Sequence, residues 1–164
     1  MISIRKATLA DVQSIIILAT TIWNEVYSNI ISKAQIDYML EARYNEYRIK
    51  SEIESEDNVY FMAFSESEFV GFAHVGLLDE DTSYLHKIYF LSNLRGKGLG
   101  KMILSEVVNF AKTNKSTSLV LNVNRANPAL GFYEKMGFET IESVDETIGG
   151  GFFVNDYVME KLIS

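Results

Sequence analysis

The chain of 164 residues is 48% hydrophobic and 23% charged, a balance typical of a soluble globular protein with one domain over residues 1–164. Its formal net charge is −7, and it has no basic tail or stripe. Nucleic-acid binding is therefore disfavoured, because neutralising phosphates requires clustered lysine and arginine.

Cysteine and histidine usage narrows the chemistry further. The sequence has no cysteine, which excludes disulfides, thiolate metal sites and a cysteine nucleophile. The two histidines, His74 and His86, lack metal-ligand spacing, so we expect no metal.

The longest apolar run, Ser14–Ala19, is too short to span a membrane, and the N-terminus lacks a secretory h-region. We therefore expect a cytoplasmic protein with no membrane partner.

The first third of the chain predicts a strand followed by helices. Ile2–Lys6 alternates between apolar and polar residues, as a short strand does. Apolar residues recur at helical spacing over Asp11–Tyr27 and predict a helix there. Ser32–Leu40 predicts a second helix that begins at a serine cap, and Tyr44–Glu54 a third.

The middle of the chain is rich in aromatic and β-branched residues. Val59–Phe64 and Phe69–Val75 predict a hairpin around a polar turn at Ser65–Glu68. Ser83–Phe90 predicts a further strand.

The last third predicts a crossover and a closing antiparallel pair. Met102–Lys112 has a helical apolar stripe, and Leu119–Asn124 reads as a buried strand. Asn127 as N-cap and Pro128 at the first helical position predict a short helix that ends at Met136. The closing strands are expected at Glu139–Ser143 and Phe153–Met159. This order of elements indicates a mixed α/β fold.

The stretch LSNLRGKGLGK, Leu91–Lys101, places three alternating glycines between a strand and a helix. The first N–H groups of a helix have no internal partner, and glycine removes the Cβ atoms that would hold an anion away. The spacing matches neither GxxxxGK[ST] nor GxGxxG. The pattern predicts a phosphate site, with a flexible turn carrying solvated charges as the alternative. The basic residues of the stretch are Arg95, Lys97 and Lys101.

The same residues resemble a known family. Arg95-x-x-Gly98-x-Gly100 is similar to the [QR]-x-x-G-x-[GA] signature of the GNAT N-acetyltransferase superfamily. Upstream, YLHKIYFLSNLRGKGLG resembles the fourth strand and pyrophosphate loop of that superfamily. Downstream, LNVNRANPALGFYEKMGF resembles its second acetyl-CoA element, including the positions of Asn127 and Tyr133. The chain looks like a small bacterial-type member with some similarity to polyamine acetyltransferases.

The resemblance implies the GNAT fold and an acetyl-CoA site. In that fold a mostly antiparallel twisted sheet, flanked by helices on both faces, splays between its fourth and fifth strands. The pantetheine arm of acetyl-CoA would pair with the main chain in that gap, and the diphosphate would lie on the glycine-rich turn. The residues implied in acetyl-CoA binding are Ile88, Tyr89, Phe90, Arg95, Gly96, Lys97, Gly98, Leu99, Gly100, Lys101, Asn127 and Lys135.

Acetyl transfer from a thioester to an amine requires removal of a proton from the ammonium and protonation of the departing thiolate. Tyr133 falls at the superfamily position whose phenol protonates that thiolate; a core aromatic is the alternative interpretation. His86 stands in Tyr84-Leu85-His86 where polyamine acetyltransferases have Y-L-E, and it is the candidate base. The alternatives are an ordered water as base and His86 as a packing residue. His74 lies in the predicted hairpin and is expected to be structural.

Superfamily members bind their acceptor with the first two helices and the loop between the last strands. Aromatic faces and carboxylates there suit an ammonium group. Trp23 lies on the apolar helix stripe and is expected in the core. The candidate acceptor-binding residues are Glu25, Tyr27, Tyr84 and Glu142, with Asp145 and Glu146 nearby.

The resemblance thus implies an N-acetyltransferase that moves an acetyl group from acetyl-CoA directly to a primary amine. A polyamine, a small amine metabolite and a protein or peptide amine are all open as the acceptor. The alternatives are a coenzyme A-binding regulatory or sensor module without turnover, and a protein for another phosphate ligand. Association of two copies into a homodimer is also left open.

Overall fold

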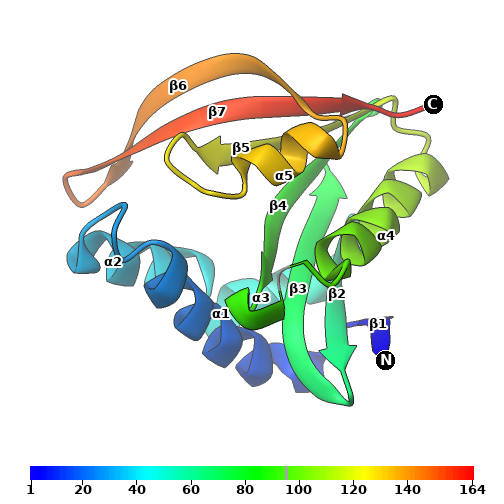
Figure 1. The fold of residues 1–164 in the computed structure, drawn as a ribbon, viewed down its shortest axis with the longest axis horizontal. Helices are drawn as coiled ribbons and strands as arrows, with labels where there is room; N and C mark the ends of the chain where they lie inside the picture. The colour runs from blue at the N-terminus through cyan, green and yellow to red at the C-terminus, as the bar shows by residue number, and fades with distance from the viewer. Residues whose placement is uncertain (95) are drawn as a thin grey trace.

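The computed structural model describes residues 1–94 and 96–164 and confirms the mixed α/β fold (Figure 1). Its sheet has seven strands in the order β1-β2-β3-β4-β5-β7-β6. All neighbouring strands run antiparallel except β4 and β5, which are parallel. The strands are β1 (Ile2–Lys6), β2 (Asn58–Ser65), β3 (Glu68–Leu77), β4 (Thr82–Phe90), β5 (Ser118–Asn124), β6 (Glu139–Gly149) and β7 (Phe152–Leu162).

Helices cover both faces of the sheet. The α-helices are α1 (Val12–Val26), α2 (Lys33–Arg43), α3 (Glu46–Glu54), α4 (Leu99–Thr113) and α5 (Leu130–Lys135), with short 3₁₀ turns at Leu9–Asp11 and Ser92–Leu94. Figure 1 shows α1, α2 and α3 on one side of the strands and α4 on the other. No helix in the described part of the chain is long and apolar enough to cross a membrane.

The two faces of the sheet belong to two separate core clusters. On β2, Tyr60 and Met62 pack with α1–α3, whereas Phe61 and Ala63 pack with α4. Successive side chains of a strand point to opposite faces, so a strand covered on both faces needs an unbroken apolar run. This requirement explains the continuous VYFMAF run in β2.

The polar caps predicted at helix starts are present for α2, and a similar cap begins α3. Ser32 Oγ accepts a hydrogen bond from the Gln35 N–H at 3.1 Å, as the serine cap predicts. Asn45 Oδ1 accepts one from the Arg48 N–H at 2.8 Å. The first cap begins α2, and the second lies in the short α2–α3 connection and begins α3.

Several predicted boundaries are wrong, and each has a local cause. Helix α4 begins at Leu99 rather than Met102, because Gly98 adopts a left-handed φ of 77° and serves as its N-cap. Helix α5 begins at Leu130, although the Asn127 side chain does accept a hydrogen bond from the Ala129 N–H at 2.8 Å. Strands β6 and β7 are longer than predicted, since they form one hairpin whose turn contains Gly150.

Strands β4 and β5 separate part of the way along their length. They pair over Thr82–Leu85 and Ser118–Leu121. Beyond Leu85, the β4 edge that faces β5 has no strand partner among the described residues, while its other edge stays paired with β3. The separation leaves main-chain hydrogen-bonding groups of β4 available inside the molecule.

A bulge lies on β4 where the separation begins. Lys87 pairs with His74 and Leu85 with Val75, so His86 is an extra residue without a partner on β3. A bulge changes the alternation of side chains. As a result, His86 and Lys87 both lie on the α1–α3 face.

The tip of the β6–β7 hairpin rests on α2. Tyr38 Oη donates a hydrogen bond to the Ile148 carbonyl at 3.0 Å, and Gln35 Nε2 donates one to the Phe153 carbonyl at 2.7 Å. The rings of Tyr38 and Phe152 pack with their centroids 5.3 Å apart.

Candidate active site

A cavity of about 410 Å³ occupies the gap between β4 and β5. It extends from the unpaired edge of β4 to the turn before α4 and to the loop after β5. Lys97 and Lys135 do not line it, and Arg95 lies outside the described residues. The sequence-predicted residues that line it are Tyr27, His86, Ile88, Tyr89, Phe90, Gly96, Gly98, Leu99, Gly100, Lys101, Asn127 and Tyr133.

The three glycines of the turn have different local roles. Gly96 and Gly98 have φ angles of 81° and 77°, and a Cβ at either position would project into open space. A Cβ on Gly100 would lie 3.0 Å from the Phe132 ring and 3.1 Å from the Phe90 ring. Gly100 therefore permits close packing of α4, whereas Gly96 and Gly98 permit the left-handed turn that opens the helix N-terminus to the cavity.

Tyr133 lies in the wall of this first cavity and is 7% exposed. Its ring packs edge-on between Phe132 and Phe138, with centroid distances of 5.5 and 5.8 Å. Burial raises the pKa of the Tyr133 phenol well above its usual value. The phenol is therefore fully protonated at neutral pH.

Three residues from three elements form a hydrogen-bonded chain across the cavity. The Asn127 side-chain amide donates to the Tyr27 hydroxyl at 3.2 Å, and that hydroxyl is 3.2 Å from the Tyr89 hydroxyl. Tyr27 follows α1, Tyr89 lies on β4 and Asn127 follows β5. Trp23, predicted in the core, is 2% exposed and stacks on Tyr27 with the ring centroids 4.5 Å apart.

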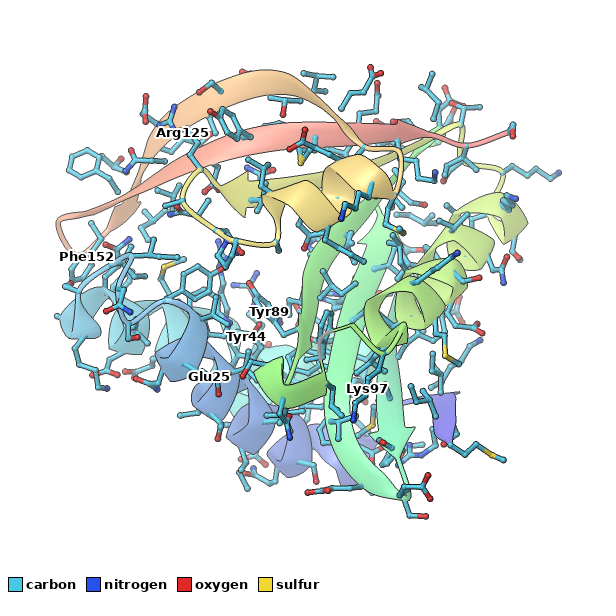
Figure 2. All side chains as sticks on the ribbon, viewed as in Figure 1. Glu25, Tyr44, Tyr89, Lys97, Arg125 and Phe152 are labelled. Atoms are coloured by element: carbon cyan, nitrogen blue, oxygen red, sulfur yellow. The ribbon has the colours of Figure 1, made fainter. Side chains whose placement is uncertain are left out.

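A second, more polar cavity of about 290 Å³ lies between α2, α3 and the β5–β7–β6 part of the sheet. Tyr84 lines it, together with Glu146. Glu25 and Glu142 line neither cavity, because Glu25 is on the exposed face of α1 (Figure 2) and Glu142 is exposed on the edge strand β6. The structure therefore does not bring these two candidate acceptor residues into the site. The residues common to both cavities are Tyr27, His86, Lys87, Tyr89 and Asn122.

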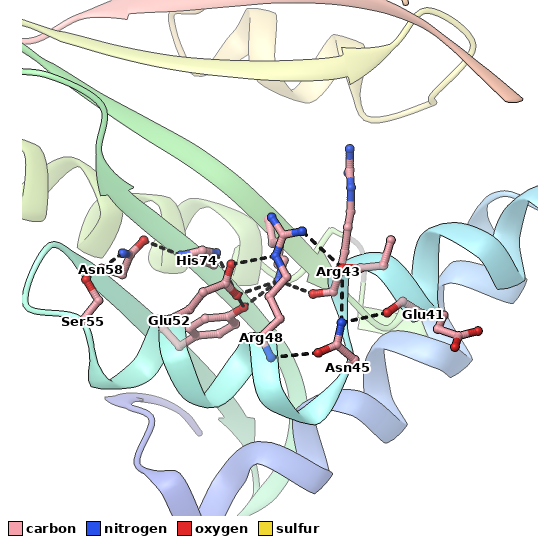
Figure 3. Close-up of polar contacts among 11 residues, drawn as sticks. Glu41, Arg43, Asn45, Arg48, Glu52, Ser55, Asn58 and His74 are labelled. Carbon is pink, nitrogen blue, oxygen red and sulfur yellow. Dashed lines mark hydrogen bonds and ion pairs between the residues drawn. The ribbon is translucent and has the colours of Figure 1, made fainter. Parts of the chain in front are cut away.

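A buried charged network missed by the sequence analysis forms one wall of the second cavity (Figure 3). Lys87 is 5% exposed, and its ammonium donates to Tyr60 Oη at 2.6 Å, the Arg43 carbonyl at 3.0 Å and Glu52 Oε1 at 3.2 Å. Glu52 also pairs with Arg48 at 3.4 Å. Burial lowers the pKa of Lys87 to about 8, and the Glu52 carboxylate opposes that decrease.

His86 lies at the junction of the two cavities. Its ring stacks on His74 with the centroids 4.5 Å apart and packs against the Tyr84 ring at 4.7 Å. One side of His86 is open to solvent, but its pKa is lowered to about 4, mainly by desolvation of the packed ring; the Glu52 carboxylate opposes the decrease, and the nearby cations led by Lys87 add to it. The imidazole is therefore neutral at pH 7 and a weak base.

His74 is a core residue, as the hairpin predicts. It is 1% exposed, and its Nε2 lies 2.7 Å from Asn58 Oδ1. Its Nδ1 has no hydrogen-bond partner among the described residues and lies 3.9 Å from Glu52 Oε1. Burial lowers the pKa of His74 well below its usual value, so the ring is neutral. In residues 1–94 and 96–164, no three His, Asp or Glu side chains form a group that could hold a metal ion.

The fold and the two meeting cavities define an N-acetyltransferase of the GNAT class. The sequence profile of the Acetyltransferase (GNAT) family matches residues 21–138, and the chain belongs to this family. The resemblance seen in the glycine-rich turn is thereby confirmed.

Individual relatives agree over nearly the whole chain. The chain is 28% identical to the spermidine N(1)-acetyltransferase of Thermoplasma acidophilum, over 98% of this chain and 96% of that protein. It is 27% identical to the uncharacterised N-acetyltransferase YuaI of Bacillus subtilis, over 92% and 87% of the two chains. The crystal structure of the PaiA N-acetyltransferase of Thermoplasma acidophilum in complex with coenzyme A superposes with a TM-score of 0.85, at 26% identity and 99% coverage of both chains.

Proposed function

We propose that this acetyltransferase moves an acetyl group from acetyl-CoA directly to a primary amine, whether of a polyamine, a small amine metabolite or a peptide. One observation carries the proposal: a cavity lined by a free strand edge and a glycine-rich helix N-terminus meets a second, polar cavity where β4 and β5 separate. Two substrates that enter from opposite sides would meet at His86 and Asn122.

The lining of the first cavity suits the chemistry of acetyl-CoA. The free edge of β4 over Ile88–Phe90 offers main-chain groups to the amide-containing pantetheine arm. The open turn at Gly96 and Gly98 offers N–H groups to the diphosphate, and Lys101 adds a positive charge beside it. Acetyl-CoA supplies the acetyl group as a thioester.

Tyr133 is the proposed acid. Its protonated phenol lies in the wall of the coenzyme cavity, and a thiolate that leaves there needs a proton. Asn127 holds Tyr27 and the turn before α5 in place, and through this turn it supports the position of Tyr133.

The amine proton has a different route. An alkylammonium has a pKa of about 10.4, so an imidazole with a pKa of about 4 is a poor acceptor for its proton. We propose that the proton leaves to water in the polar second cavity and that His86 contacts the acceptor as a neutral hydrogen-bonding group.

The test of the function combines binding and turnover. Coenzyme A is expected to raise the melting temperature, and a mixture of acetyl-CoA and a primary amine is expected to release free thiol at a rate that depends on the amine. Thiol release that is independent of the amine would contradict direct transfer. A rise in melting temperature without thiol release for any of a panel of amines would contradict turnover.

A Tyr133→Phe variant tests the acid. We expect its kcat to fall about a hundredfold, because the thiolate must leave unprotonated, while its affinity for coenzyme A stays within twofold of wild type. The matched control is Tyr157→Phe, which removes a phenol from β7 outside both cavities. Equal kcat values for the two variants would remove Tyr133 from the mechanism.

A further inference from the structure

We propose that the acceptor is a diamino acid, a small molecule that carries one carboxylate together with two amino groups, and that Arg43 is the residue that selects the carboxylate. This inference rests on the proposed function and assigns the acceptor to the second cavity. It narrows the acceptor from any primary amine to one chemical class.

The charges that line the second cavity are balanced rather than uniformly acidic. The lining has three cationic and three anionic side chains, and His86 is neutral at pH 7. A site for a polycation is expected to have carboxylates and no unpaired cation facing the ligand, because a like charge there would repel it. The six charged residues are Arg43, Arg48, Lys87, Glu52, Glu146 and Asp156.

Three of these six side chains already pair with one another, two cations with one carboxylate. Glu52 pairs with both Lys87 and Arg48, at 3.2 and 3.4 Å. Within the described part of the chain, Arg43, Glu146 and Asp156 form no ion pair. One cation and two anions are therefore left to face the acceptor.

The main chain at Arg43 is fixed, and its side chain is directed into the cavity. Arg43 is the last residue of α2, and its carbonyl accepts from Lys87 Nζ at 3.0 Å. The preceding carbonyl, of Ala42, accepts from Arg48 Nη1 at 3.2 Å. Figure 3 shows the Arg43 side chain rising from the end of α2 towards β5 and β7, away from the contacts of the Lys87 network. A guanidinium held in this way presents a planar pair of donors that matches a carboxylate.

The two unpaired carboxylates lie on the opposite wall. Asp156 and Val154 are two residues apart on β7, so they share a face, and Glu146 is the partner of Val154 on β6. Val154 packs in the core cluster of α1 and α2, which places that face towards Arg43. Burial raises the pKa of Asp156, and an ammonium bound beside it would reverse this effect.

A matched series of three amines separates the contributions of these charges. Lysine carries a carboxylate and two amino groups, cadaverine lacks the carboxylate, and 6-aminohexanoate lacks the α-amino group. We expect kcat/KM for lysine to exceed that for each of the other two at least tenfold. Cadaverine cannot form the charge-assisted hydrogen bonds to Arg43, and 6-aminohexanoate cannot form those to Asp156.

Two variants assign the preference to residues. Arg43→Gln is expected to lower kcat/KM for lysine about tenfold or more and to leave cadaverine within threefold, whereas Asp156→Asn is expected to reduce the preference for lysine over 6-aminohexanoate. Arg43→Lys should retain most of the preference for lysine over cadaverine. Arg125→Gln is the matched control, because Arg125 pairs with Asp145 outside both cavities and its loss changes the net charge equally.

The outcomes distinguish this inference from the function on which it rests. Spermidine or cadaverine as the best acceptor, with a preference that Arg43→Gln leaves unchanged, would overturn the diamino acid while supporting acetyl transfer to an amine. Coenzyme A binding with no acetylation of lysine would overturn it as well. Failure to bind coenzyme A, together with no turnover of any amine, would instead overturn the proposed function. Melting temperatures of the variants within 3 °C of wild type exclude misfolding as the cause of a lost preference.

Discussion

At the scale of single residues, the bulge on β4 determines the chemistry of the site. It turns His86 and Lys87 to the same face, so a ring at the cavity junction lies next to a buried ammonium. The loss of water is the main reason for the low pKa of about 4 of the imidazole; the ammonium lowers this pKa as well, and the Glu52 carboxylate opposes both effects. The bulge therefore makes His86 a neutral residue throughout the physiological range.

The pH dependence of turnover tests this account. Because His86 is already neutral above about pH 5, the value of kcat/KM should follow the fraction of unprotonated amine alone. It should rise about tenfold per pH unit from pH 6 to pH 7, below the pKa of about 8 of Lys87, in wild type and in His86→Gln alike. An inflection near pH 6.5 that disappears in His86→Gln would show that this histidine titrates as the base.

Residues tied to a local motif could be predicted from the sequence, and residues brought together by the fold could not. Gly98, Tyr133 and Asn127 line the first cavity, and all three stand in the two stretches of sequence that resemble the family. Lys87 and Glu52 are 35 residues apart, and a lysine in an alternating strand normally reads as solvent-exposed. Their contact depends on the bulge, and no residue type in Ser83–Phe90 predicts a bulge there.

At the scale of elements, the turn between β4 and α4 combines two uses of glycine. Gly98 adopts the left-handed conformation with open space around it, whereas Gly100 has ordinary helical geometry but is crowded by aromatic rings. Glycine is thus needed for its backbone angle at Gly98 and for the absence of a side chain at Gly100.

A pair of glycine substitutions separates backbone strain from ligand contact. Gly98→Ala and Gly151→Ala both place a Cβ at a positive φ, 77° and 80°, with no atom within 4 Å. Each should cost about 1 kcal/mol of stability in chemical denaturation. Gly98→Ala alone should raise the KM for acetyl-CoA about tenfold, because its Cβ projects where the diphosphate would lie. Equal KM values for the two variants would contradict a phosphate site at this turn.

Element types followed from periodicity, but their ends did not. The bounds of strands β2 and β3 and of helices α1 to α3 lie within a few residues of the predicted bounds, since the apolar spacing of these elements is regular. The β6–β7 hairpin was predicted too short because its outer strand is almost entirely exposed and polar, so no apolar alternation marks its length. The cross-strand pairing with β7 creates that strand.

At the scale of the whole molecule, the Lys87 network links segments that are far apart in the sequence. Among the described residues, no other buried ion pair links these segments. It connects the end of α2, helix α3 and strand β2 to β4, directly beside the cavity junction. The network therefore contributes both to stability and to the position of His86.

Loss of this lysine should be far more damaging than loss of an exposed one. Lys87→Met leaves Tyr60 Oη and the Arg43 carbonyl without their buried donor, removes one ion-pair partner of Glu52, and should lower the free energy of unfolding by about 3 kcal/mol. Lys50→Met, on the exposed ion pair of α3 with Glu46, should change it by less than about 0.5 kcal/mol. Urea denaturation of the two variants gives both values, and a difference below 1 kcal/mol would contradict a structural role for the network.

The contact between the β6–β7 hairpin and α2 bears on access to the second cavity. The hydrogen bonds from Tyr38 and Gln35 hold the hairpin tip beside the second cavity, and each contributes about 1 kcal/mol net in water. Thermal fluctuation can break two such bonds on the microsecond-to-millisecond scale without disturbing the sheet. Lifting of the tip would widen the second cavity at the edge that Ile148 and Val154 form.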